Sequence, residues 1–177
     1  MLEFTKVSDE VLYSPGAITQ VNRNDIGCLK ELAARNPRRR IRLCAHPDTA
    51  DPLHEMLIVH MRDAYVPPHR HPGKSESFLI IEGELSVVVF DEAGGVTDVI
   101  DMGEPGSGRA FYYRLSEARY HTVIATTDVV VFHEVTNGPF RQEDLERAPW
   151  APGEDDLEAQ RNFLRGIPPD PALGRRP

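Results

Sequence analysis

Three histidines and one glutamate have the types and the spacing of a metal-binding set. His69 and His71 are two residues apart. In an extended chain such residues point to the same side, so both imidazoles can reach one ion. Glu76 follows after a stretch that suits a tight reversal, directly before a strongly apolar segment, and His121 begins another apolar segment far downstream. The sequence therefore predicts one metal ion held by His69, His71, Glu76 and His121.

Three neutral imidazoles and one carboxylate form a mixed set of nitrogen and oxygen ligands. Such a set suits one divalent transition metal ion (Fe, Mn, Ni, Co or Zn) and leaves one or two positions for water or substrate. An ion with open positions can act as a Lewis acid on a carbonyl or hydroxyl group, and iron can bind dioxygen. The expected chemistry is therefore that of a metal-dependent isomerase, epimerase or oxygenase.

The segments that must position these ligands are short, rich in Val, Ile, Phe and Tyr, and bounded by Gly, Pro or Asp. These features predict strands, at 39–44, 55–62, 77–82, 84–91, 96–102, 110–114, 121–125 and 128–135. Because no helix interrupts them, an all-β closed barrel or sandwich is expected. The residues Glu92-Ala93-Gly94-Gly95 supply the turn of a hairpin.

The chain divides into three parts around this run of strands. Residues 1–38 form an N-terminal arm with one helix, which we expect to start at Asn24-Asp25 and to stop at Asn36-Pro37. Residues 39–140 form the barrel. Residues 141–177 form a C-terminal extension with a weak helix from about Asp155 to Arg165, and its tail from Pro168 onward is predicted to be disordered.

The spacing His69-x-His71-x4-Glu76-x6-Gly83 resembles the first signature of the cupin superfamily. Ala64-Tyr65 stands where the opening glycine of that signature is expected. The second signature, Pro-x-Gly-x-x-His, corresponds to residues 116–121, which keep His121 but lack both the proline and the glycine. The resemblance implies a cupin-type antiparallel β-barrel, a jelly roll, with the metal inside.

A closer resemblance, over about residues 25–152, is to the WbuC family of cupin-fold metalloproteins. It is carried by RLCAHP (42–47), PPHRHPGKSESF (67–78), residues 114–122, FHEVTNGPF (132–140) and APWAP (148–152). Where that family has Asn two residues before the His-Pro pair, this chain has Cys44. Members often accompany bacterial surface-polysaccharide genes, so the resemblance implies a bacterial protein acting on a small polar molecule such as a sugar or sugar phosphate.

Other charged and aromatic residues have two interpretations each. His46, Arg42 and Lys74 are candidates for binding an anionic substrate, although Arg42 and Lys74 are as well explained as surface charges. The cluster from Arg38 to Arg42 fits a solvated edge strand or loop better than an anion site. The remaining candidates are a barrel exterior or subunit contact for His54 and His60, a surface or structural role for His133, and one inward-facing ring from the adjacent pair Tyr112 and Tyr113.

Composition excludes several classes of protein. The formal net charge of −8 argues against binding to nucleic acid, which usually needs a concentrated basic surface. No segment reaches the ~18 apolar residues of a membrane helix, and the charged first twenty residues do not form a signal peptide. Cys28 and Cys44 lie in unlike contexts, so we expect reduced thiols and a cytoplasmic location.

Two functions from different classes fit the sequence. The first is a metal-dependent enzyme, including a cupin dioxygenase, and the second is a non-catalytic module that binds a metal or a small molecule. The chain has no room for a DNA-binding helix-turn-helix, which would mark a sensor, and this absence favours the enzyme. We also expect a homodimer, because the strand around Met56 to Met61 is apolar on both faces and only one face can line a barrel. A partner subunit or the terminal arm would cover the other face.

Overall fold

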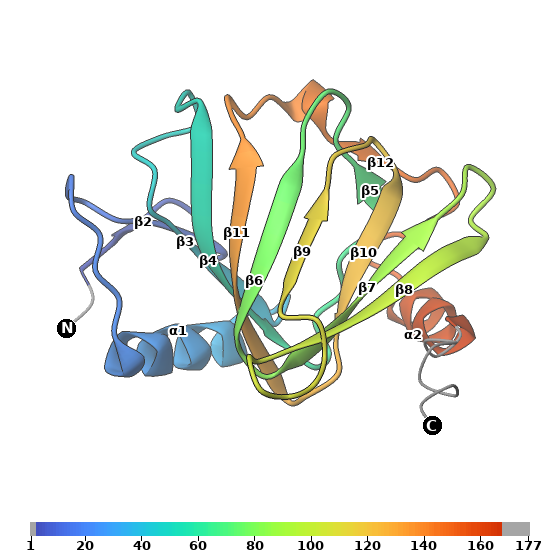
Figure 1. Cartoon of the computed structure of the whole chain (residues 1–177), viewed down its shortest axis with the longest axis horizontal. Coiled ribbons are helices and arrows are strands. Elements are labelled where there is room, and N and C mark those ends of the chain that lie inside the picture. Colours follow the sequence, from blue (N-terminus) through green and yellow to red (C-terminus); the bar gives the residue numbers. More distant parts are fainter. Residues whose placement is uncertain (1–2, 168–177) are drawn as a thin grey trace.

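The computed structural model describes residues 3–167, which form two packed β-sheets with an α-helix beside each (Figure 1). One sheet has seven strands in the order β1-β2-β3-β4-β11-β6-β9, and the other has five in the order β12-β5-β10-β7-β8. The elements are β1 (Thr5–Lys6), β2 (Val11–Tyr13), α1 (Arg23–Arg35), β3 (Arg40–Cys44), β4 (Leu53–Met61), β5 (His69–Arg70), β6 (Glu76–Glu82), β7 (Glu84–Phe90), β8 (Val96–Gly103), β9 (Tyr112–Leu115), β10 (Tyr120–Ala125), β11 (Val129–Asn137), the 3-10 turn η1 (Gln142–Asp144), β12 (Glu146–Arg147) and α2 (Leu157–Gly166).

The eight strands from β4 to β11 form a jelly roll. Four of them, β4-β11-β6-β9, are neighbours in one sheet, and the other four, β5-β10-β7-β8, are neighbours in the facing sheet. Neighbours within each run of four are antiparallel. The chain passes back and forth between the two sheets, which is the double Greek-key order of jelly rolls, a fold that includes the cupins. The predicted all-β, cupin-type antiparallel barrel is therefore confirmed.

Gly83 makes the tight passage from β6 to β7 possible. Its φ angle is +78°, a conformation that favours glycine. A Cβ atom at this position would lie 2.3 Å from the backbone oxygen of Val129. The glycine that ends the first cupin-like signature is thus required by the crossing of the chain beside β11.

The barrel core lies between the two sheets and is made of alternate residues of each strand. Met56 and Ile58 of β4 and Phe78 and Ile80 of β6 belong to one buried cluster. Their partners in the cluster come from both sheets: Cys44, Leu85, Val87, Val89, Met102, Val123, Ala125, Val130 and Phe132. Because strand side chains alternate between faces, the next residue of the same parity on each strand also faces this interior.

Helix α1 covers the outer face of the seven-stranded sheet. Its N-terminus is capped by Asn22, which accepts hydrogen bonds from the backbone N–H groups of Asn24 and Asp25, so the helix begins slightly earlier than predicted. Leu29 and Ala33 are fully buried. They pack in a second apolar cluster with Ile41, Leu43, Val59 and Val131.

This packing bears on the expected homodimer. The outward-facing Leu57, Val59 and Met61 of β4 lie in the cluster under α1, so the terminal arm covers the face that the dimer was expected to cover. The dimer stays a prediction, without that argument for it. Light scattering at tens of micromolar checks it, since a monomer would contradict it.

His54 and His60 point the other way from our expectation. Both have the parity of Met56 and Ile58 on β4, both are buried, and the His60 ring meets Phe132 edge to face at 5.4 Å. The parity of the strand was read correctly, but the sequence does not show which face α1 covers. Neither histidine lies on the barrel exterior.

The C-terminal extension packs closely on the five-stranded sheet. Strand β12 pairs with β5, and α2, close to its predicted bounds, contributes Phe163 to a cluster with Phe90, Tyr120 and Trp150. In Figure 1 this helix lies beside β7 and β8, at the opposite end of the molecule from α1. The predicted disordered tail from Pro168 lies outside the described residues.

Within residues 3–167, neither α-helix combines the length and the apolar character that crossing a membrane would require.

Candidate metal centre

The four predicted ligands come from three neighbouring segments at one end of the barrel. His69 and His121 face each other in register across β5 and β10. His71 follows β5, and Glu76 is the first residue of β6. Glu76 has the parity of the core residues Phe78 and Ile80, so its side chain enters the interior. The structure thus brings together all four residues.

The three histidines converge closely enough to share an ion. Their ligand nitrogens all lie within 4.8 Å of one another, and no other group of three or more such residues in the described chain does this. The ring centroids are 4.9 Å apart for His69 and His71 and 4.7 Å apart for His69 and His121. This arrangement matches the three-histidine part of many transition-metal sites.

Each histidine is oriented by a backbone carbonyl at its Nδ1 atom. The distances are 2.9 Å from His69 to the oxygen of Pro67, 3.3 Å from His71 to that of Asp144, and 3.0 Å from His121 to that of Arg119. A carbonyl can only accept, so Nδ1 carries the proton in each case. Every Nε2 atom is then left with a free lone pair, as metal-binding histidines require.

Glu76 completes the group but lacks a well-formed partner. Its side chain is only 5% exposed, and its Oε1 atom lies 2.8 Å from Nε2 of His121. The two atoms are close enough for a hydrogen bond but are not aligned for one, and both are buried without any other partner. A carboxylate oxygen facing an imidazole lone pair is repulsive unless a cation or a proton lies between them.

The charges inside the centre respond to one another. Burial and the neighbouring histidines lower the pKa of His69 to about 3, and burial likewise lowers that of His71. Burial opposes charge on His121 and Glu76 too, but their mutual attraction prevails, so the pKa of His121 is raised and that of Glu76 is lowered. The residues therefore favour positive charge between Glu76 and His121, and they fit a divalent metal ion at that place.

Lys74, a candidate substrate residue, is engaged by the protein. Its Nζ atom lies 3.0 Å from the carboxylate of Asp144, and its side chain is only 11% exposed. The backbone oxygen of the same Asp144 accepts the hydrogen bond from His71. Lys74 therefore fixes the segment that orients one of the candidate ligands.

Of the other two candidates, Arg42 lies on β3 and His46 lies two residues beyond the end of that strand. His46 is buried, stacks on His54 at 4.0 Å, and is held through Nδ1 by the backbone of Glu55. Arg42 is exposed and lies in register with Ile58, and its guanidinium has no hydrogen-bond or ion-pair partner among residues 3–167. Arg42 is thus the cation of the three that stays available for a ligand.

Sequence reasoning missed Glu134 on β11. It has the same parity as Val130 and Phe132 of the barrel core, so it faces the interior. Burial and the nearby Glu76 raise its pKa to about 8. The signal was present in the strand predicted at 128–135, where Val130 and Phe132, on the same face as Glu134, are both apolar.

Tyr113 is the inward-facing member of the tyrosine pair. It packs against the barrel core opposite Phe78, whereas Tyr112 is 55% exposed. The Tyr113 hydroxyl is buried with no partner in the described chain. Burial and then the charge of Glu76 raise its pKa, so this hydroxyl stays protonated.

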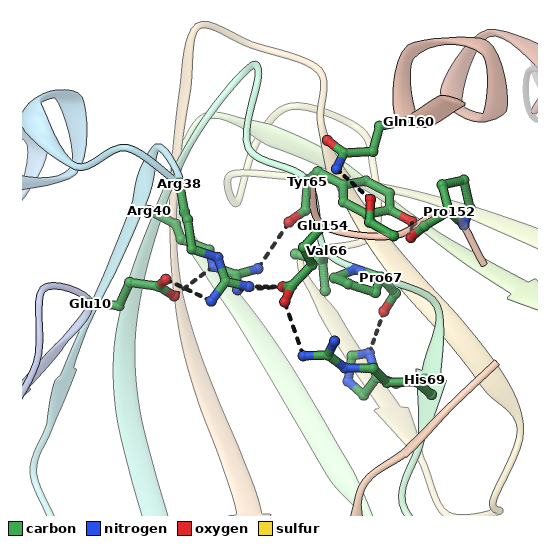
Figure 2. A network of polar contacts seen from close by, with 12 residues as sticks. Glu10, Arg38, Arg40, Tyr65, Val66, Pro67, His69, Pro152, Glu154 and Gln160 are labelled. Atoms are coloured by element: carbon green, nitrogen blue, oxygen red, sulfur yellow. Dashed lines mark hydrogen bonds and ion pairs between the residues drawn. The ribbon is translucent and has the colours of Figure 1, made fainter. Parts of the chain in front are cut away.

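The arginine cluster is mostly an internal ion-pair network, shown in Figure 2. Arg38 and Arg40 both pair with Glu10 of the N-terminal arm and with Glu154 of the C-terminal extension. Arg147 also pairs with Glu154. The expectation of solvated charges on an edge is therefore wrong for Arg40, whose side chain is only 16% exposed, whereas Arg38 is ion-paired but stays 42% exposed.

This network predicts a measurable contribution to stability. The variant Glu154→Gln should lower the free energy of unfolding by about 1–3 kcal/mol, between the values typical of exposed and buried ion pairs, because three arginines lose a partner. Urea unfolding measures the change. The control Glu31→Gln, which removes the exposed pair with Arg35, should change it by less than about 0.5 kcal/mol. Equal effects of the two variants would contradict the prediction.

Comparisons with known proteins found one matching family model and a set of similar structures. Residues 21–102 match a family described as a domain of unknown function, DUF6016. No curated protein matches the sequence. A solved structure of protein SO0799 from Shewanella oneidensis is similar at 11% identity and a TM-score of 0.47, covering 58% of this chain and 66% of that one.

Oxalate decarboxylases are also among the similar structures. A variant of the Bacillus subtilis enzyme OxdC has 21% identity and a TM-score of 0.44, over 55% of this chain and 24% of the enzyme. The Lactobacillus farciminis enzyme in complex with formate has 19% identity and a TM-score of 0.42, over 56% and 28%. This chain thus spans about a quarter of those enzymes. Its own strand order, with the histidine group inside the barrel, shows that it has the cupin fold.

Proposed function

We propose that this protein is a metal-dependent cupin whose ion is held by His69, His71, Glu76 and His121. The observation that carries the proposal is the convergence of one ligand nitrogen from each of three histidines within 4.8 Å, beside a buried carboxylate that has no aligned partner. A divalent cation removes the repulsion between these groups and balances the charge of Glu76.

The bound ion would supply Lewis acidity to a carbonyl, hydroxyl or phosphoryl oxygen of a ligand. The protein's own residues prepare the place. The carbonyls of Pro67, Asp144 and Arg119 hold the three imidazoles in the ligating tautomer. Because Glu76 is buried, its carboxylate attracts a cation more strongly than it would in water. The ligand set suits Fe, Mn, Ni, Co or Zn.

We propose an enzyme acting on a small polar molecule, such as a sugar or sugar phosphate of surface-polysaccharide metabolism. The resemblance to WbuC proteins supports this substrate class, and the unpaired guanidinium of Arg42 supports an anionic group on the substrate. His46, two residues beyond the end of β3, is the second candidate contact. A cytoplasmic bacterial homodimer remains part of the proposal.

Metal analysis and two assays test the proposal. The protein is purified without chelators and without nickel affinity, and its metal is identified by mass spectrometry. The metal-loaded protein is then incubated with a panel of nucleotide sugars and sugar phosphates, and oxygen uptake is recorded. Turnover of a sugar supports the proposed enzyme, and oxygen uptake by an iron form supports a dioxygenase. Stoichiometric metal with neither activity supports a non-catalytic binding module, and absence of metal overturns all three.

A further inference from the structure

Glu134 lies in a row of side chains across the inner face of the seven-stranded sheet. Strand register places Cys44, Met56, Glu134, Phe78 and Tyr113 side by side on neighbouring strands. All except Glu134 pack in or against the apolar core. A carboxyl side chain therefore occupies the central strand of an otherwise largely apolar row.

The carboxyl group of Glu134 has no partner within residues 3–167. No hydrogen bond or ion pair is formed by its side chain, although the residue is half-buried. The charges that act on it are those of Glu76 and His121 on one side and of Arg42 on the other. Glu134 thus lies between the candidate metal centre and the free guanidinium.

A carboxyl group without a partner at this position lowers the stability of the folded protein. A partly buried carboxyl without a hydrogen bond to the protein is less stable there than in water, and an apolar side chain at this position would pack with Met56 and Phe78. Residues that break the local packing rule in this way are typical of functional sites. The energetic cost is therefore a reason to look for a ligand.

We propose that Glu134 contacts the ligand of the metal centre, donating a hydrogen bond to an anionic oxygen whose charge Arg42 balances. The inference rests on the proposed function and narrows its ligand to a small oxyanion, a carboxylate or a phosphate. Anionic oxygens only accept hydrogen bonds, so Glu134 carries the proton in the complex. The burial that raises its pKa acts in the same direction.

The test uses the full-length protein loaded with cobalt(II), with acetate and inorganic phosphate as probes. Calorimetry measures their binding to wild type, Glu134→Leu and Glu134→Gln. The leucine variant should bind the preferred probe about tenfold more weakly or worse, as expected for loss of a hydrogen bond to a charged group. The glutamine variant keeps an N–H donor and should bind much more like wild type. The probe bound more tightly identifies the oxyanion as a carboxylate or a phosphate.

Two further readouts separate a ligand contact from a structural role. Cobalt stoichiometry should be the same in all three proteins, and the apo form of Glu134→Leu should melt at a higher temperature than wild type. The control is Glu55→Leu on the adjacent strand β4, where Glu55 is in register with Val135 and is half-exposed. That variant should leave probe binding unchanged.

Each outcome bears on a different proposal. Wild-type probe affinity in Glu134→Leu, or a lower apo melting temperature, overturns this inference alone. Failure of wild type to bind either probe overturns the oxyanion class while the metal centre stands. Failure of wild type to bind cobalt overturns the proposed function and this inference with it.

Discussion

A variant that carries both His69→Ala and His71→Ala should contain no stoichiometric metal. One ligand nitrogen from each of these two imidazoles and one from that of His121 lie within 4.8 Å of one another. Changes to residues that merely support a metal site cost about 10–100-fold in affinity, so losing two direct ligands should cost at least about 100–10,000-fold if the effects multiply. Metal content after purification without chelators, measured by mass spectrometry, checks the result.

The matched control for this variant is His133→Ala. His133 is a partly exposed histidine on β11 whose Nε2 atom lies 3.8 Å from Glu55, on the opposite face of the strand from Glu134. Its removal should leave metal content unchanged. Near-normal metal in the double variant would end the proposal of a metal at this site.

Replacing Glu76 by glutamine should weaken metal binding without unfolding the barrel. Glu76 is buried at the start of a strand whose inward residues are Phe78 and Ile80, where an uncompensated carboxylate is costly. Glutamine keeps the shape and removes the charge that a divalent cation requires. The metal affinity should therefore fall at least about 10–100-fold, and the apo protein should still melt cooperatively.

Metal titrations and apo melts of wild type and Glu76→Gln decide the role of this carboxylate. The control Glu82→Gln changes a glutamate at the other end of the same strand, where it pairs with Lys30, and should leave metal affinity unchanged. If Glu76→Gln binds metal as wild type does, Glu76 is only a neighbour of the ligands. If its apo form no longer melts cooperatively, the residue is structural.

The metal-binding residues were predictable because their geometry is local or repeats along a strand. His69 and His71 share a face by the two-residue period of extended chain, and Glu76 starts the next strand inward. His121 required knowledge of strand pairing, because it is the jelly-roll order that brings β10 beside β5. The second cupin-like signature lacks its proline and glycine, but Arg119, held by Asp98 at 2.9 Å, still presents its carbonyl to His121.

The residues that the sequence did not reveal depend on contacts between distant segments. Arg38 and Arg40 could not be matched with Glu10 and Glu154 before the two ends of the chain were placed. Glu134 was hidden for a related reason, since its inward position depends on which face of β11 is covered by α1. Because the position of α1 was not known from the sequence, His54 and His60 were assigned to the wrong face of β4. The uncovered face of that strand was also taken as an argument for a dimer.

The pairing of β12 with β5 has a consequence for the order in which the centre is completed. β5 has only two residues, and β12 places Arg147 beside His69 on the side away from β10. Until residues 146–147 arrive, that strand has a partner on one side only. Because a ribosome makes these residues after the whole barrel, His69 is held on both sides only late in synthesis. Nascent chains that end before β12 would therefore lack one of the two strands that hold His69, and stable metal loading would follow the docking of the extension.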